Sequence, residues 1–481
     1  MSRLVFEPTW ESLRQYTCPA WFRDAKFGIW AHWGPQCAPM VGDWYARNMY
    51  TQGHAQYEHH CRTYGHPSKV GYKDIIQLWR GEKFDPEALI DLYRGAGARY
   101  FVSMGVHHDN FDLWNSRHHR WNAVNFGPRR DIVGAWKKAA EAAGLRFGVT
   151  EHLERSWSWF NTNKGADSYG PYAGVPYDGN DPAFQDLYFP PHDDSNHAYP
   201  KNPPETWVKT WSDRITDLVE SYEPDLLYSD GAVPFGEAGR RLVAHFYNVN
   251  VARHGGKLEA VYNLKDMRDY DARTGVCHGD YVEGVGVRDM ERGVVDGIYP
   301  TPWQTDTCIG GWFYDSRRKY KTPTEVVRLL VDIVSKNGNL LLNITQRPDG
   351  SLDEIAEWTV REIGAWMRVN GEAIYGTRPW RQYSEGETQL ASGHFAEGEK
   401  REFTARDFRF TVKGEQLYAI ALGWPEQDWL VRSLAGDTVK DVAVLGCAEP
   451  PEWAMTPEGL RVARPKSQPS HSAWTLRVTL G

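Results

Sequence analysis

The stretch FGIWAHWGP, from Phe27 to Pro35, begins as an apolar run and ends with an imidazole and an indole before a Gly-Pro turn. A near-continuous apolar run of this length is typical of a strand that is buried on both faces, as in a parallel sheet. His32 and Trp33 stand where the expected strand meets a loop. Polar rings are uncommon at the end of a buried strand, so the residues that follow the other predicted strands are compared below.

Runs of the same kind alternate with segments of helical spacing along most of the chain. The strand-like runs are 26–33, 99–106, 145–152, 225–230, 257–263 and 339–344, and the helical segments include 85–98, 131–144, 203–224 and 322–338. Several helical segments have Pro near the start or Gly near the end. Repeated βα units predict a (β/α)8-like barrel. A doubly wound open sheet is the alternative, and the absence of GxGxxG after the first strand disfavours it.

The sequence changes in character after about Gly376. Short alternating runs such as FRFTVKG and SAWTLRVTL are separated by Gly, Pro, Asp and Asn, which predicts an antiparallel β domain, specifically a sandwich. A chain of 481 residues also exceeds one ordinary hydrophobic core. We therefore expect a barrel over 1–375 and a small C-terminal β-sandwich over 376–481. The Pro-, Gly-, Asp- and His-rich segment 161–203 predicts a long loop that lines a site.

Composition narrows the classes of partner. The net charge of −8 argues against nucleic acid, which needs concentrated Lys and Arg, and no apolar run is long enough to cross a membrane. The first residues, MSRLVFEPTWESL, do not resemble a signal peptide. The six cysteines are scattered, which indicates free thiols and a cytoplasmic location. The 22 Trp residues suit either sugar binding or an aromatic-rich core.

Polar and aromatic residues follow the predicted strands at the same end each time. In a βα barrel these carboxyl ends form one rim, where active sites lie. Such a group of side chains can hold a divalent metal, or it can bind sugar hydroxyls while two carboxylates cleave a glycosidic bond. Neither HxH nor HExxH is present, so we expect no metal and no cofactor, and the Trp content favours sugar. The residues are His32, His107, His108, Asp109, Glu151, His152, Asp230, Asn263, Trp303, Gln304 and Asn343.

Four motifs in order resemble the family 29 glycoside hydrolases, the α-L-fucosidases. They are WFRDAKFGIWAHWGP with DWY at 43–45, VHHDNFDLW at 106–114, YSDG at 228–231 and SKNGNLLLNITQRPDG at 335–350. The resemblance covers roughly residues 10–370, and the β-rich tail agrees with the small C-terminal sandwich of that family. It implies retaining hydrolysis of terminal α-L-fucose from oligosaccharides or glycoconjugates, through a covalent fucosyl-enzyme.

The resemblance also implies catalytic roles. Asp230, in YSDG, matches the nucleophile. Many members of the family carry the acid/base as Glu after Trp, but that slot holds Gln304 here, and an amide cannot transfer a proton. Fucosidases with the WQTDT variant resemble this chain in having Glu-Arg-Gly upstream, so Glu291 is the predicted acid/base. Glu283 and Glu151 are the alternatives.

Substrate contacts follow from the same resemblance. The matched histidines are expected to bond fucose hydroxyls, Asp43 replaces the usual Glu of the family, and Trp303 is a candidate to stack on the sugar. The expected substrate-binding residues are His32, Asp43, Trp44, Tyr45, His107, His108, Glu151, His152 and Trp303. The alternatives are an α-L-galactosidase, a sugar-binding protein without catalysis, and a metal-dependent hydrolase. The expected partner is a fucosylated oligosaccharide, with no nucleic acid and no membrane, and homo-oligomer formation stays open.

Overall fold

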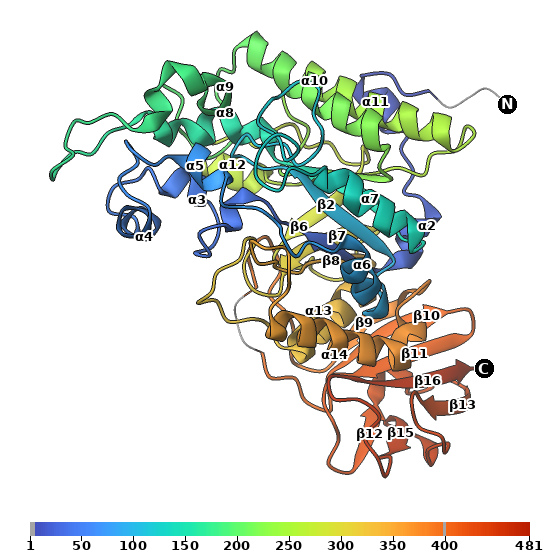
Figure 1. The fold of residues 1–481 in the computed structure, drawn as a ribbon. Coiled ribbons are helices and arrows are strands. Elements are labelled where there is room, and N and C mark those ends of the chain that lie inside the picture. Colours follow the sequence, from blue (N-terminus) through green and yellow to red (C-terminus); the bar gives the residue numbers. More distant parts are fainter. Residues whose placement is uncertain (1–4, 398–400) are drawn as a thin grey trace.

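The computed structural model describes residues 5–397 and 401–481, so the first four residues of the N-terminal stretch lie outside it. Eight parallel strands close into a barrel in the order β1 to β8, as the sequence predicts (Figure 1). The strands are β1 (Phe27–Ala31), β2 (Tyr100–Val106), β3 (Arg146–Glu151), β4 (Leu226–Ser229), β5 (Val261–Lys265), β6 (Val287–Glu291), β7 (Trp303–Cys308) and β8 (Gly338–Asn343).

The barrel closes because β1 pairs with both β2 and β8. Its interior is filled by large side chains, including Trp30, Tyr100 and Tyr228. Gly28 is required at its position, because a Cβ there would lie 2.3 Å from ring atoms of Tyr100. The barrel is therefore a packed core, and chemistry is confined to its rim.

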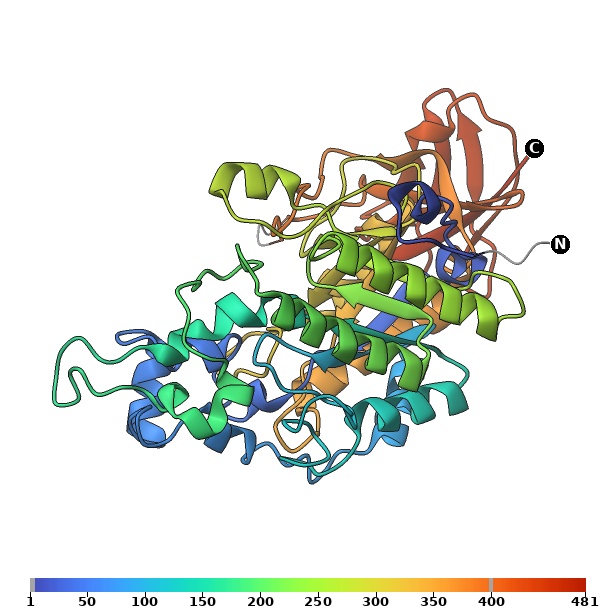
Figure 2. The same cartoon turned by 90° about the horizontal axis from the view of Figure 1, so that it is seen from above.

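Helices cover the outside of the barrel, and the long α10 and α11 pack side by side (Figure 2). α7 packs on β2 and β3 and α13 on β8, each through a buried apolar face, which explains their helical spacing in the sequence. The helices are α1 (Trp10–Leu13), α2 (Ala20–Ala25), α3 (Tyr45–Asn48), α4 (Ala55–Thr63), α5 (Tyr72–Ile76), α6 (Pro86–Gly95), α7 (Ile132–Ala142), α8 (Ser156–Trp159), α9 (Gln185–Tyr188), α10 (Glu205–Tyr222), α11 (Glu237–Arg253), α12 (Arg268–Thr274), α13 (Pro323–Ser335) and α14 (Glu354–Asn370).

The C-terminal domain consists of two antiparallel sheets that share one apolar core, as expected for a sandwich. One sheet has the order β13-β16-β11-β10-β9 and the other β12-β15-β14. The strands are β9 (Arg378–Glu385), β10 (Phe408–Lys413), β11 (Gln416–Ala421), β12 (Asp428–Val431), β13 (Val439–Val444), β14 (Trp453–Thr456), β15 (Gly459–Ala463) and β16 (Trp474–Leu480). Residues 371–377 link this domain to α14 of the barrel domain.

The barrel and the sheets are joined through α13 and α14, which lie between them (Figure 1). Arg409 of β10 is fully buried and donates to Asp332 of α13, whose carboxylate also pairs with Lys336 at 2.9 Å. Trp366 of α14 donates its indole N–H to the Ala473 carbonyl. A buried charged pair at this junction fixes how the domains meet, because a displaced partner would leave an unpaired buried charge.

The structure differs from the sequence prediction at three neighbouring strands. β5 covers Val261–Lys265 and not 257–263, so Lys265 and not Asn263 ends it. β6 was not predicted, because VRDME carries charges in place of an apolar run. β7 begins at Trp303, a residue expected at a strand end. All three strands have polar residues that face the barrel interior. They therefore do not appear as apolar runs in the sequence, which is the pattern used to predict the other strands.

Two other expectations bear on the cysteines and the membrane. All six cysteines lie in the described residues, and none forms a disulfide there. Across residues 5–397 and 401–481, every helix is too short or too polar to cross a bilayer. The cytoplasmic location and the oligomeric state stay predictions.

Candidate functional site

The carboxyl ends of the barrel strands bring seven side chains together, which we call the strand-end cluster. His32 follows β1, His107 and His108 follow β2, His152 follows β3 and Asp230 follows β4. Lys265 is the last residue of β5 and Glu291 the last of β6. Six of these seven were predicted from the sequence, and Lys265 was not.

Three histidines of the cluster face one another closely. The ring centroid of His32 lies 5.0 Å from that of His107 and 5.4 Å from that of His152, both edge to face. The rings of the sequence neighbours His107 and His108 lie 4.2 Å apart. Adjacent residues on a strand would point to opposite faces, but both lie beyond the end of β2, so both turn toward the cluster.

Hydrogen bonds fix how two of these rings present their nitrogens. Gln36 accepts from the Ala46 N–H and donates its amide N–H to His107 Nδ1 at 2.8 Å, so His107 Nε2 carries the proton. His108 donates from Nδ1 to the His152 carbonyl at 2.6 Å, which leaves Nε2 as an acceptor. Burial lowers the pKa of His108 to about 4 and that of His107 well below its usual value. One donor and one acceptor, both uncharged, suit recognition of hydroxyl groups.

Asp230 is the most strongly charge-paired carboxylate of the cluster. Lys265 Nζ lies 2.7 Å from Oδ1, and an Arg155 guanidinium nitrogen lies 3.2 Å from Oδ2. His108 Nε2 and His152 Nδ1 each lie 3.5 Å from Oδ2. Burial by itself would raise the pKa of Asp230, but the charges of Arg155 and Lys265 hold it well below its usual value. Asp230 is therefore an ionised carboxylate, the form that a nucleophile requires.

Glu291 lies across the same lysine from Asp230. Lys265 Nζ is 2.5 Å from Glu291 Oε2 and 2.7 Å from Asp230 Oδ1. The distance between these two carboxylate oxygens therefore cannot exceed the sum of the two contacts. Burial raises the pKa of Glu291 to about 7, with Lys265 opposing the rise and Asp306 and Asp230 adding to it. A carboxyl with a pKa near neutrality can both give and take a proton.

Lys265 keeps its charge although its side chain is only 2% exposed. Burial would lower its pKa, but Asp230, Asp306 and Glu291 raise it well above the usual value. Asp306, one layer deeper in the barrel, lies 3.7 Å from the ammonium and accepts from the Tyr228 hydroxyl. The ammonium thus neutralises a cluster of carboxylates that could not otherwise be buried together.

Asp43 and Trp44 approach the cluster from the loop after β1. Burial raises the pKa of Asp43 to about 7, and the charges of Glu291 and Asp230 add to the rise, so Asp43 lies within their field. The half-buried Trp44 lies edge to face with His108, at 6.3 Å between centroids. Its backbone is left-handed, with φ of 61°, an unusual conformation for a large residue. Strain of this kind is common at binding sites.

Aromatic rings enclose one side of the cluster. Trp312 and Phe313, from the loop after β7, lie 5.6 Å and 4.6 Å from the His32 ring. Trp30, inside the barrel, contacts both His32 and Trp312. Trp312 is only partly buried. Polar groups opposite an aromatic face are the arrangement that binds a sugar ring.

Two predicted contacts are wrong because the side chains face another layer. Glu151 is fully buried, and it accepts from the Ser229 hydroxyl and the Trp211 indole, on the helix side of β3. Tyr45 is fully buried and donates to His60 Nδ1 at 2.7 Å. Successive side chains point in different directions, so a neighbouring residue faces the strand-end cluster instead. His152 does so beside Glu151, and Trp44 does so beside Tyr45.

The predictions for Trp303 and Gln304 are wrong because they begin β7 and do not end it. Trp303 donates its indole N–H to the Lys336 carbonyl at the opposite end of the barrel. Gln304 accepts from the Tyr100 hydroxyl and donates to Asp289, inside the barrel core. Gln304 is therefore not a lost acid/base. The alternative acid Glu283 is exposed and bonds two surface tyrosines, Tyr281 and Tyr299.

Sequence analysis missed three residues that contribute to the site. Lys265 was hidden because its strand was placed two residues too early, and Arg155 because it lies in a 3-10 turn, Leu153–Arg155, after β3. Trp312 lies in GGWFY, at 310–314, a stretch to which the sequence analysis assigns no role. The Lys-Asp pair after VYNL was the one available signal for Lys265, since charge rarely follows a core strand without a partner.

Two groups of side chains have donor atoms close enough for one metal ion, His32–His107–His152 and His108–His152–Asp230, each within 4.8 Å. In the first group, the protonated Nε2 of His107 cannot act as a ligand unless Gln36 rearranges. In the second group, Asp230 is already paired with Lys265 and Arg155. These contacts favour a hydroxyl-bearing ligand over a metal.

An eight-stranded parallel barrel with two carboxylates and several imidazoles at its carboxyl rim is an arrangement that glycoside hydrolases use. The sequence model described as "Alpha-L-fucosidase" matches residues 1–372, and that described as "Alpha-L-fucosidase C-terminal domain" matches residues 400–479. The chain belongs to the alpha-L-fucosidase family.

Two curated relatives match along nearly the whole chain. Rat plasma alpha-L-fucosidase is 31% identical and covers 100% of this chain and 95% of its own length. Human tissue alpha-L-fucosidase is 28% identical, and the match covers 98% of this chain and 92% of the human protein. Thermotoga maritima alpha-fucosidase, solved with a mechanism-based inhibitor, superposes with a TM-score of 0.76 at 27% identity. The match covers 98% of this chain and 100% of the Thermotoga chain. A second structure of the Thermotoga protein, with fucose, has a TM-score of 0.74.

Proposed function

We propose that this chain is a retaining exo-α-L-fucosidase that removes terminal α-L-fucose from oligosaccharides or glycoconjugates. The observation that carries the proposal is the pair of carboxylates held by one lysine. Asp230 and Glu291 both contact Lys265 Nζ, so their separation is compatible with the about 5–5.5 Å typical of retaining glycosidases. An inverting enzyme needs more room for a water molecule between its carboxyl groups.

The two carboxyl groups take different roles because their surroundings differ. Asp230, ionised by its cations, attacks C1 of fucose, and the C1–O bond to the leaving group breaks. Glu291, with a pKa near 7, gives its proton to the departing oxygen. In the second half, Glu291 takes a proton from water, which attacks C1 and releases Asp230. Fucose leaves with the same anomeric configuration as in the substrate.

The remaining cluster would hold the sugar. The Nε2–H of His107 donates to one hydroxyl, and the bare Nε2 of His108 accepts from another. Trp312, which is only partly buried, is suited to contact the apolar face of the ring or the C6 methyl group. Fucose complexes of the Thermotoga relative support this choice of sugar.

The test is hydrolysis of 4-nitrophenyl α-L-fucoside beside the same aglycone on other sugars, including α-L-galactose. We expect cleavage of the fucoside, loss of nearly all activity in Asp230→Asn, and azide rescue of Glu291→Ala. The first anomer released, followed by proton NMR, should be α-L-fucose. Release of β-L-fucose would refute retention, a preference for the galactoside would change the substrate, and binding without cleavage would identify a sugar-binding relative.

A further inference from the structure

A loop of the C-terminal domain lies directly against the predicted acid/base. The segment 392–397, which we call the His394 loop, belongs to the connection between β9 and β10. Its backbone follows the chain that leaves β6. Phe395 N–H donates to the Glu291 carbonyl at 2.8 Å, and Glu397 N–H donates to the Arg292 carbonyl at 2.9 Å. Gly393 N–H donates to the Val294 carbonyl at 2.9 Å.

The side chain of His394 connects two barrel strands. Its Nδ1 accepts from the Glu291 N–H at 3.1 Å, so Nε2 carries the proton and donates to the Asp266 carbonyl at 3.1 Å. Glu291 ends β6, and Asp266 follows Lys265 at the end of β5. One imidazole therefore ties together the two strand ends whose side chains, Lys265 and Glu291, form an ion pair at 2.5 Å.

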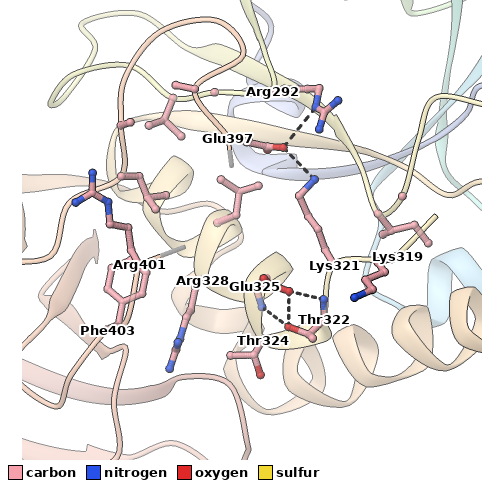
Figure 3. A pocket seen from close by; sticks show the side chains of 18 of the residues that line it. Arg292, Lys319, Lys321, Thr322, Thr324, Glu325, Arg328, Glu397, Arg401 and Phe403 are labelled. Atoms are coloured by element: carbon pink, nitrogen blue, oxygen red, sulfur yellow. Dashed lines mark hydrogen bonds and ion pairs between the residues drawn. The ribbon is translucent and has the colours of Figure 1, made fainter. Parts of the chain in front are cut away.

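The loop is anchored by a second side chain, Glu397. Its Oε2 accepts from the Thr307 hydroxyl at 2.8 Å. The same oxygen pairs with Lys321 at 2.9 Å and lies 3.8 Å from Arg292 Nε (Figure 3). Thr307 belongs to β7, so the loop is fixed to three neighbouring strands of the barrel. On this side it borders a pocket of about 530 Å³ that Ala396 also lines.

The fit between the loop and the strand end depends on close backbone approach. A Cβ on Gly293 would lie 1.8 Å from the Gly393 carbonyl oxygen. Arg292 and Phe395 both have left-handed backbones, with φ of 46° and 58°. Such residues each cost about 1 kcal/mol and persist only where surrounding contacts determine the conformation. The contacts that do so here are the backbone hydrogen bonds around Glu291.

His394 is suited to act as an uncharged acceptor. Burial, with the nearby ammonium of Lys265, lowers its pKa to about 4, against the opposing charge of Asp306. The Arg288 guanidinium adds to the lowering. At neutral pH the Nδ1 lone pair is thus free to accept from Glu291.

We propose that His394 is a positioning residue for the general acid/base, and that through the His394 loop the C-terminal domain completes the active site of the barrel. The inference rests on the proposed role of Glu291. His394 touches neither substrate nor reacting atoms; it holds the backbone from which the Glu291 carboxyl extends. Because misplacement by about 1 Å can cost about 10²-fold in rate, loss of this hydrogen bond reduces proton transfer to the leaving group.

The test compares a leaving group that needs a proton with one that does not. 4-Nitrophenolate departs readily, whereas a sugar hydroxyl departs only when protonated. For His394→Ala we expect kcat/KM to fall at least about tenfold more on an α-L-fucosyl disaccharide than on 4-nitrophenyl α-L-fucoside. His394→Asn keeps an acceptor for the Glu291 N–H, so it should recover most of the lost rate on the disaccharide and remove most of the difference between the two substrates. His471→Ala, at an exposed histidine of the same domain, should change neither rate.

Equal losses on the two substrates, or no loss, would overturn the inference, because a merely structural histidine does not distinguish leaving groups. If His394→Ala does not fold, as judged by thermal melting, Gly293→Ala displaces the same loop and is measured in its place. Glu291→Ala separates the two proposals. If it shows the leaving-group dependence and His394→Ala does not, only the inference fails; if Glu291→Ala also lacks it, the acid/base assignment fails.

Discussion

Replacement of Lys265 by methionine should move the whole pH profile of the enzyme upward. The ammonium contacts Asp230 at 2.7 Å and Glu291 at 2.5 Å, and it lies 3.7 Å from Asp306. It lowers the pKa of both Asp230 and Glu291, the two proposed catalytic carboxyl groups. Methionine keeps the unbranched shape of the side chain but lacks the ammonium group, so the change removes the charge together with its hydrogen bonds to the two carboxylates.

The size of the effect follows from these contacts. At an effective dielectric constant of about 20, a unit charge pair at about 4 Å is worth about 4 kcal/mol, and the two catalytic contacts are shorter. If water that enters the site compensates for two thirds of this loss, about 1.3 kcal/mol remains for each carboxyl group. That free energy corresponds to about one pH unit on each limb of the profile. Removal of one partner from a buried pair also costs about 3–5 kcal/mol of stability.

The assay is kcat/KM for 4-nitrophenyl α-L-fucoside against pH, with thermal melting of the same samples. The acid limb reports ionisation of Asp230 and the alkaline limb loss of the proton from Glu291, so both should rise in Lys265→Met. Lys265→Arg keeps the charge and should leave both limbs near the wild-type values. Lys209→Met, at an exposed pair with Asp213, is the surface control. Unmoved limbs in a folded Lys265→Met variant would refute the reasoning.

Other predictions test the aromatic rings beside the strand-end cluster and the junction between the two domains. Trp312→Ala should raise KM about three- to tenfold, as expected for a lost ring contact, whereas Trp303→Phe should leave KM unchanged; the reverse pattern would restore the role first expected of Trp303. Arg409→Met should lower the unfolding free energy by about 3 kcal/mol, the lower end of the cost of breaking a buried ion pair, because Asp332 loses Arg409 but keeps Lys336. Burial would raise the pKa of Asp332, but Arg409 and Lys336 hold it below the usual value, so this stability is present above the ordinary carboxyl pKa of about 3.9 and is lost as pH falls through the folded pKa. Denaturant unfolding at pH 7 and at low pH should show a smaller effect of Arg409→Met at low pH, and an equal effect at both would contradict the assignment.

The sequence predicted those parts of the site that local pattern encodes. His32, His107, His108 and Asp230 follow apolar runs, and an apolar run that breaks into polar residues marks the carboxyl end of a buried strand. Lys265 and Glu291 follow strands whose own residues are polar, and the pattern fails there. Glu291 was found only through its resemblance to a family motif, and Lys265 was not found. Their neighbours on the strands face the barrel interior, where Asp289 and Asp306 are buried.

What the sequence by itself determined is the class of fold and most of the residues at one rim. Periodicity sets which residues form strands and helices, and chain order sets that the strand ends converge. Only the tertiary structure decided which neighbour of each pair, Glu151 or His152, Tyr45 or Trp44, faces the site. It alone placed a lysine between the two carboxylates and a loop of the C-terminal domain against Glu291. The physical reason is that side-chain direction and contacts between residues distant in sequence depend on register and packing, which no local pattern contains.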